Sequence, residues 1–175
     1  MKRMSQAENV KLVVLADRLR EVSALIGFTR IDAPRDRAGN DEGLDPRAPL
    51  SLFDTDWVPC AETRGEGIFI RLNEKALRRW EDRVGGSEPV ERLRTGYATW
   101  RTARGLQPDV GWPGARYVLL HTLSHVLIRE LSLEAGYSSA SIRERIYAGA
   151  GDEPMAGVLL YTAATDSEGT LGGLV

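Results

Sequence analysis

The chain begins with an amphipathic pattern. Apolar residues recur between Val10 and Ile26 with the spacing of one face of a helix, and Ser5 and Glu8 form a capping box ahead of them. Gly27 is a typical helix end. We therefore predict an N-terminal helix within residues 1–31.

The next stretch, residues 32–56, has a different composition. Prolines and glycines stand among charged residues there, and the apolar content is too low for an ordered element, so we predict a flexible loop. Two β-prone stretches follow, at 57–62 and 67–72, on either side of Thr63-Arg-Gly-Glu66. This arrangement predicts a β-hairpin, and Pro59 predicts that the first strand lies at a sheet edge.

Helical patterns dominate the remainder of the chain. We predict helices at 73–84, 87–104 and 115–134, a short helix at 138–147 with Ser141 and Glu144 at capping-box spacing, and one apolar strand at 157–163. The predicted fold class is α+β, mainly helical with a small mixed or antiparallel sheet.

Composition narrows the possible functions. A length of 175 residues fits one modest domain. Cys60 is the only cysteine, which excludes an internal disulfide and a zinc site built from several cysteines of this sequence. No apolar stretch reaches the ~18 uncharged residues of a membrane span, so we expect a cytoplasmic protein. The net charge of −2 argues against a generic nucleic-acid binder.

The middle of the chain differs in charge from both ends. Residues 64–104 contain 10 basic and 6 acidic side chains, and aromatic residues lie among the arginines. Such a mixture suits single-stranded nucleic acid, where cations follow the phosphates and bases stack on rings. The alternative is a solvated helix surface with Trp80, Tyr97 and Trp100 in the core. The candidate contacts to nucleic acid or to a protein partner are Arg64, Arg71, Arg78, Arg79, Arg83, Arg101 and Arg104.

His121 and His125 stand one helical turn apart in the predicted helix 115–134. This spacing could supply two zinc ligands, and a metal-dependent hydrolase is therefore an alternative function. However, Thr122 stands where the metalloprotease motif has glutamate, and any further ligands would have to be carboxylates. We favour a hydrogen-bonded packing role for both histidines, with metal binding as the alternative.

Two other kinds of site are weakly indicated. No Gly-x-Ser-x-Gly elbow is present, and Ser124 falls inside a predicted helix, which argues against a serine hydrolase. Gly169, Gly172 and Gly173 follow a predicted strand, but without the Lys-Ser/Thr continuation of a phosphate-binding loop. They are more typical of a tight turn.

Several runs together resemble a known family. The runs at 121–128, 136–147, 157–163 and 166–175 are similar to the MrfA-like zinc-binding domain family, and within it to the DrmB proteins of the DISARM anti-phage defence system. Residues 19–22, 27–30 and 64–69 also resemble DrmB proteins. The residues that carry the family motif are His121, His125, Tyr161, Asp166, Gly169, Gly172 and Gly173.

The resemblance implies both a function and a division of the chain. Residues 57–175 would be a partial zinc-binding domain core, because the family's cysteine cluster follows the Gly-Gly-Leu-Val stretch that ends at Val175. We therefore expect no cofactor in this chain, and zinc only in the full-length family domain. The implied role is that of a non-catalytic accessory subunit, which works with a DrmA-like helicase ATPase and helps that partner engage DNA.

Overall fold

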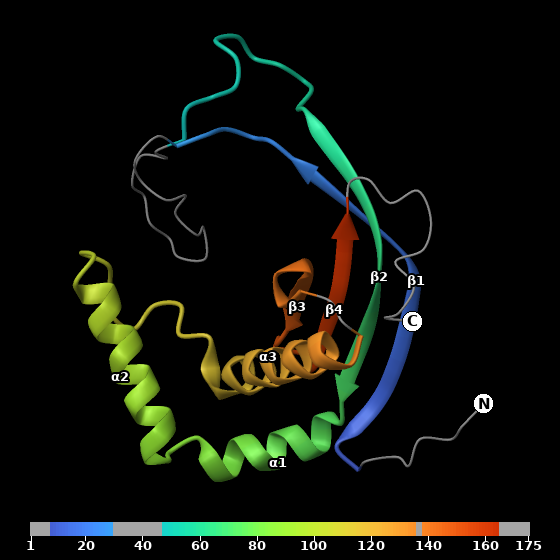
Figure 1. The fold of residues 1–175 in the computed structure, drawn as a ribbon. Coiled ribbons are helices and arrows are strands. Elements are labelled where there is room, and N and C mark those ends of the chain that lie inside the picture. The colour runs from blue at the N-terminus through green and yellow to red at the C-terminus, as the bar shows by residue number, and fades with distance from the viewer. Residues whose placement is uncertain (1–7, 30–46, 136–137, 165–175) are drawn as a thin grey trace.

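A computed structural model describes residues 8–29, 47–135 and 138–164 (Figure 1). The strands β1 and β2 come first, three helices follow, and a pair of shorter strands completes the described chain. All strand pairs are antiparallel, and the order across the sheet is β1-β2-β4-β3. The elements are β1 (Val10–Ala24), β2 (Cys60–Leu72), α1 (Glu74–Val84), α2 (Glu88–Thr102), α3 (Gly114–Ala135), the 3-10 helix η1 (Ser139–Ser141), β3 (Ile142–Tyr147) and β4 (Gly157–Ala164).

The sheet is larger than the sequence predicted. The fold is α+β, but the expectation of a mainly helical protein with a small sheet is wrong, because β1 and β2 span 15 and 13 residues. Figure 1 shows these two strands as a long curved pair that extends well beyond α3. The four-stranded antiparallel sheet is therefore a principal layer of the fold.

The predicted N-terminal helix is also wrong, since Val10–Ala24 forms the edge strand β1. The consecutive apolar residues from Leu12 to Leu15 fit a strand as well as a helix, so periodicity alone could not separate the two. Pairing with β2 along most of the strand decides the outcome. Residues 10–24 thus share one sheet with the rest of the described strands.

The predicted hairpin at 57–72 does not form. The residues expected to turn are part of β2, where Gly65 pairs with Leu19 of β1 on one side and with Ala163 of β4 on the other. Pro59 stands immediately before β2, and β2 lies inside the sheet and not at its edge. Long-range pairing therefore overrides the local turn signal.

The three long helices and the last strand are confirmed. The side chain of Asn73 accepts hydrogen bonds from the amides of Lys75 and Ala76, which makes it the cap of α1. The short helix predicted at 138–147 is wrong, because η1 gives way to β3 at Ile142. From Ile142 to Ile146, inward-facing positions alternate with exposed ones, as is typical of a strand. This period of two outweighs the capping-box spacing of Ser141 and Glu144.

The core lies where α3 covers β3 and β4. Leu120 of α3 and Val158 and Leu160 of β4 are fully buried, and Ile128 and Ile142 complete the cluster. This packing positions one side of α3 directly against β3, which determines the geometry of the candidate site described below.

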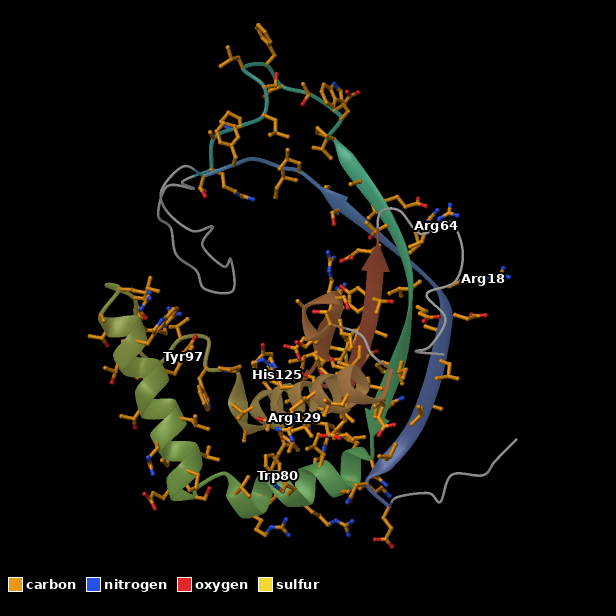
Figure 2. The ribbon with its side chains drawn as sticks, viewed as in Figure 1. Arg18, Arg64, Trp80, Tyr97, His125 and Arg129 are labelled. Atoms are coloured by element: carbon orange, nitrogen blue, oxygen red, sulfur yellow. The ribbon has the colours of Figure 1, made fainter. Side chains whose placement is uncertain are left out.

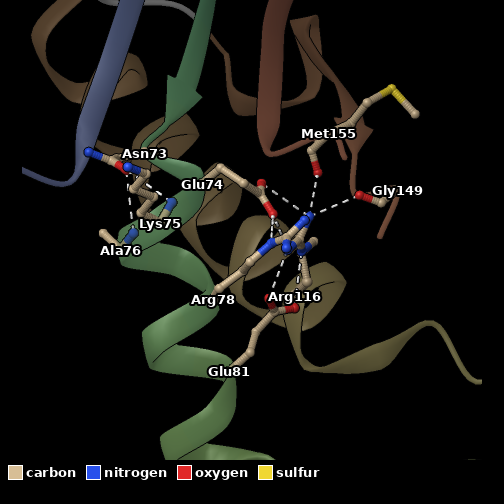
Figure 3. A network of polar contacts seen from close by, with 9 residues as sticks. All are labelled: Asn73, Glu74, Lys75, Ala76, Arg78, Glu81, Arg116, Gly149 and Met155. Atoms are coloured by element: carbon tan, nitrogen blue, oxygen red, sulfur yellow. Dashed lines mark hydrogen bonds and ion pairs between the residues drawn. The ribbon is translucent and has the colours of Figure 1, made fainter. Parts of the chain in front are cut away.

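A buried arginine joins the core to α1 (Figure 3). Arg116 is 4% exposed, and its guanidinium forms ion pairs with Glu74 and Glu81 at 2.7 and 2.8 Å. It also donates to the carbonyls of Gly149 and Met155. Burial raises the pKa of Glu74, but hydrogen bonds from Arg116 and Arg78 outweigh burial and hold that pKa below its usual range.

The predicted loop at 32–56 is described only in part. Residues 32–46 lie outside the described residues, and residues 47–56 contain no helix or strand beyond an isolated bridge between Phe28 and Ala48. Among the described helices, none combines the length and apolar character needed to cross a membrane.

Candidate functional site

His121 and His125 lie beside the buried side of α3. The buried positions of this helix recur every four residues, at Arg116, Leu120, Ser124 and Ile128. Each histidine stands one residue away from that row and remains partly open to solvent, with side-chain exposures of 43% for His121 and 64% for His125. Their rings are in contact, and the two Nε2 atoms are 2.8 Å apart.

Glu144 of β3 completes a cluster with the two histidines. Its Oε1 lies 3.1 Å from Nε2 of His121 and 3.8 Å from Nε2 of His125. The buried hydroxyl of Ser124 contacts the other oxygen, Oε2. Three ligand-type atoms from α3 and β3 therefore lie within 4.8 Å of one another, which is an arrangement that could hold a metal ion.

Glu144 belongs to a segment whose sequence pattern predicts a helix, so its position beside the histidines was not predicted. In β3, Ile142, Glu144 and Ile146 share the inward face, while Arg143 and Arg145 are exposed. A carboxylate between two isoleucines on the core side of a strand needs a polar or cationic partner. That alternation was the available signal, but it becomes informative only once residues 142–147 are known to form a strand.

The arginines of the middle region do not form one continuous surface. Arg64 lies on β2, and Figure 2 shows it across the molecule from Tyr97 of α2. Arg78 pairs with Glu74 on α1 at 3.0 Å, and Arg104 follows α2. Of the other candidates, Arg71 lies on β2, Arg79 and Arg83 lie on α1, and Arg101 lies on α2.

Aromatic rings and arginines do gather at the C-terminal end of α2. Tyr97 stacks on Trp100 with ring centroids 6.0 Å apart, and Trp112 packs on Tyr97 at 5.6 Å. The Arg104 guanidinium lies 4.2 Å above the Trp100 ring, and Arg101 donates to the Tyr97 hydroxyl. We call Tyr97, Trp100, Arg101, Arg104 and Trp112 the α2 cluster. Trp100 is exposed and not a core residue, in contrast to the alternative weighed from the sequence.

Tyr161, one of the family-motif residues, joins three strands. From β4 its hydroxyl donates to Glu21 of β1 at 3.1 Å, and Arg143 of β3 donates to the same carboxylate at 2.8 Å. Burial, together with the hydrogen bond to Glu21, raises the pKa of Tyr161. Gly67 stands opposite in β2, and a Cβ there would meet the Cβ of Tyr161 at 2.8 Å. The remaining motif residues, Asp166, Gly169, Gly172 and Gly173, lie outside the described residues.

Comparison with known proteins connects this part of the structure to a family. The model of the MrfA Zn-binding domain matches residues 123–175, which include most of α3, all of β3 and β4, and two members of the cluster, His125 and Glu144. The match covers less than a third of the chain. The predicted resemblance to a domain family described as zinc-binding is therefore confirmed over these residues.

The similarity extends over the rest of the chain. The DISARM protein DrmB of Bacillus paralicheniformis is 40% identical over 172 residues, which cover 93% of this chain and 28% of that relative. This chain therefore spans less than a third of the DrmB protein that it matches. The likeness includes β1, β2 and α2 as well as the MrfA zinc-binding segment.

Proposed function

We propose that this chain acts as a non-catalytic accessory part of a DISARM-type anti-phage defence complex in the cytoplasm, and that it helps a DrmA-like helicase ATPase engage DNA. The observation that carries the proposal is the 40% identity to DrmB across 93% of the chain. Because the chain covers 28% of that relative, the proposed role concerns only the part of the complex's activity that these residues could support.

The α2 cluster supports a direct contact with single-stranded DNA. None of the 15 residues of α2 is buried, so the helix contributes little to the core of the described structure. The Trp100 ring is 48% exposed and already carries a guanidinium on one face. Exposed rings next to arginines provide the stacking and phosphate contacts that bind single strands without sequence preference.

The alternative of a metal-dependent hydrolase is less well supported, although Glu144 strengthens its metal site. Hydrolysis at such a site also requires a base that takes a proton from the metal-bound water. Glu144 is the only carboxylate in the cluster of the described residues, and as a ligand it would not be free for that task. An accessory role therefore accounts better for the arrangement.

The proposal can be tested by measuring fluorescence anisotropy of a labelled single-stranded oligonucleotide. Arg104→Ala and Arg83→Ala form a matched pair, because each removes one exposed cation at the end of a helix. We expect Arg104→Ala to weaken binding and to reduce the slope of log affinity against log salt by about 0.7. Arg83 is also one of the contacts predicted from sequence, but it lies on α1, outside the α2 cluster, so under this proposal Arg83→Ala should leave the affinity close to that of the unchanged protein.

Trp100→Ala provides an independent readout. Loss of a stacking ring should weaken binding by about 1–3 kcal/mol while leaving the salt slope unchanged, because no phosphate contact is removed. If Arg83→Ala and Arg104→Ala weakened DNA binding equally, net charge and not the α2 cluster would account for the binding. Unaltered affinity in both Trp100→Ala and Arg104→Ala would assign DNA engagement to the partner and overturn this part of the proposal.

A further inference from the structure

We propose that His121, His125 and Glu144 bind one divalent transition-metal ion of the zinc type. The sequence alone favours a packing role for the two histidines, because any further ligand would have to be a carboxylate, whereas the fold supplies such a carboxylate from β3. The ligand set is made of two imidazole nitrogens and one carboxylate oxygen, and does not involve cysteine. It is therefore separate from the cysteine cluster that the family resemblance implies, and it stands independently of the proposed role in DNA engagement.

The spacing of the three atoms fits a single ion. Ligands placed about 2.0–2.1 Å from a tetrahedral zinc ion lie about 3.3–3.4 Å from one another. The three separations in the cluster are 2.8, 3.1 and 3.8 Å, which fall on both sides of that value. Small rotations of the two partly exposed imidazole rings are enough to equalise them.

Hydrogen bonding alone explains this convergence less well. A neutral imidazole offers only a lone pair at an unprotonated Nε2, and an ionised carboxylate offers only acceptors. If Nε2 of His121 carries a proton, it can donate a hydrogen bond to either His125 or Glu144. The separation of 3.8 Å between Nε2 of His125 and Oε1 of Glu144 is too long for a hydrogen bond. One cation would satisfy all three atoms at once.

The surroundings of the ligands also favour a metal site. Ser124 is fully buried and contacts the second oxygen of Glu144, so it can orient the carboxylate as partners of metal ligands commonly do. The ring of Tyr117 packs on His121 with centroids 5.7 Å apart. Arg129, which lies one turn beyond His125, is paired with Glu130 at 3.7 Å, so a counter-charge accompanies its positive charge.

The choice of metal follows from the ligand types. Imidazole and carboxylate together suit zinc, while calcium and magnesium prefer oxygen ligands alone. Three protein ligands leave one tetrahedral position for water or for a group from a partner. A bound ion would also tie α3 to β3, so occupancy should stabilise the packed part of the fold.

The proposal can be tested on the chain after treatment with a chelator, by calorimetric titration with zinc chloride and by absorption spectroscopy with cobalt(II). We expect one ion per chain, a cobalt spectrum of tetrahedral type, and a higher melting temperature with zinc. His125→Ala and Glu144→Gln should abolish all three effects. Ser124→Ala should weaken zinc binding by about 10–100-fold, because the carboxylate would lose its orienting contact.

Two controls distinguish this site from other zinc binding. Cys60→Ser removes the only thiol, and Glu134→Gln removes an exposed carboxylate from the far end of the same helix, so both variants should bind zinc as the unchanged chain does. His125 is largely exposed, and circular dichroism of His125→Ala without metal should show a folded protein. Absence of stoichiometric zinc in the folded unchanged chain, or retained zinc in His125→Ala, would overturn the proposal.

Discussion

The region around α3, β3 and β4 differs from the more exposed part of the fold, which consists of the two separate elements β1 and α2, in what holds it in place. In the first region, fully buried side chains such as Leu120 and Leu160 pack between helix and sheet. In the second, β1 is joined to β2 chiefly by backbone pairing, and the side chains from Leu12 to Leu15 are 42–54% exposed. The described part of the MrfA zinc-binding match, residues 123–135 and 138–164, falls in the packed region.

This difference indicates where stability and recognition reside. Burial of apolar area supplies most of the favourable free energy of folding, so the packed region should dominate stability. Exposed apolar and aromatic side chains on β1 and α2 contribute little to folding and are available for contacts with other molecules. Substitutions in the two regions should therefore differ in their effects, and the predictions below are ordered by expected size.

The largest effect is expected from Arg116→Ala. The substitution leaves Glu74 and Glu81 without their shared cation in a buried setting, and breaking such a network costs about 3–5 kcal/mol. Arg78→Ala is the matched control, because Arg78 pairs with the same Glu74 from an exposed position and should cost less than about 1 kcal/mol. Urea denaturation followed by circular dichroism measures both. Similar losses for the two variants would show that the buried network adds nothing beyond a surface pair.

Leu160→Ala and Leu15→Ala compare the two regions directly. Leu160 is fully buried in β4, so its truncation should cost about 2–5 kcal/mol through lost transfer energy and the cavity left behind. Leu15 lies on β1 and is 54% exposed, so the same change should cost less than about 1 kcal/mol. The free energies of unfolding come from the same urea experiment. If Leu15→Ala were as costly as Leu160→Ala, β1 would belong to the core after all.

The strength of local signals explains which parts of the fold could be predicted from sequence. The helices carry such signals, for example the cap of α1 at Asn73 and the long apolar pattern of α3, and they form where they were predicted. β1 and β2 depend on each other across the 35 residues that separate them, so the local pattern around Leu12 and the turn signal around Gly65 gave the wrong elements. Pairing partners distant in sequence leave no local trace.

Only part of the candidate site could be predicted from the sequence. The spacing of His121 and His125 follows from helix geometry, and their proximity was expected from the sequence. Glu144 comes from a strand that was predicted to be a helix, and its approach depends on how β3 packs against α3. A ligand set divided between two elements can be recognised only when the packing of those elements is known.

The smallest effect is expected where the two regions meet, at Tyr161. Tyr161→Phe removes one hydrogen bond to the carboxylate of Glu21 while keeping the buried ring, so it should cost about 1–2 kcal/mol. Because the folded protein raises the pKa of Tyr161, this contribution should be present below the ordinary tyrosine pKa and should be lost as pH rises through the folded value. The difference in unfolding free energy between the unchanged chain and Tyr161→Phe, measured from neutral to alkaline pH, should therefore shrink. A difference that stays constant across this range would show that the hydroxyl does not tie β1 to β4, and that backbone pairing and the contact between Arg143 and Glu21 hold β1 to the packed region.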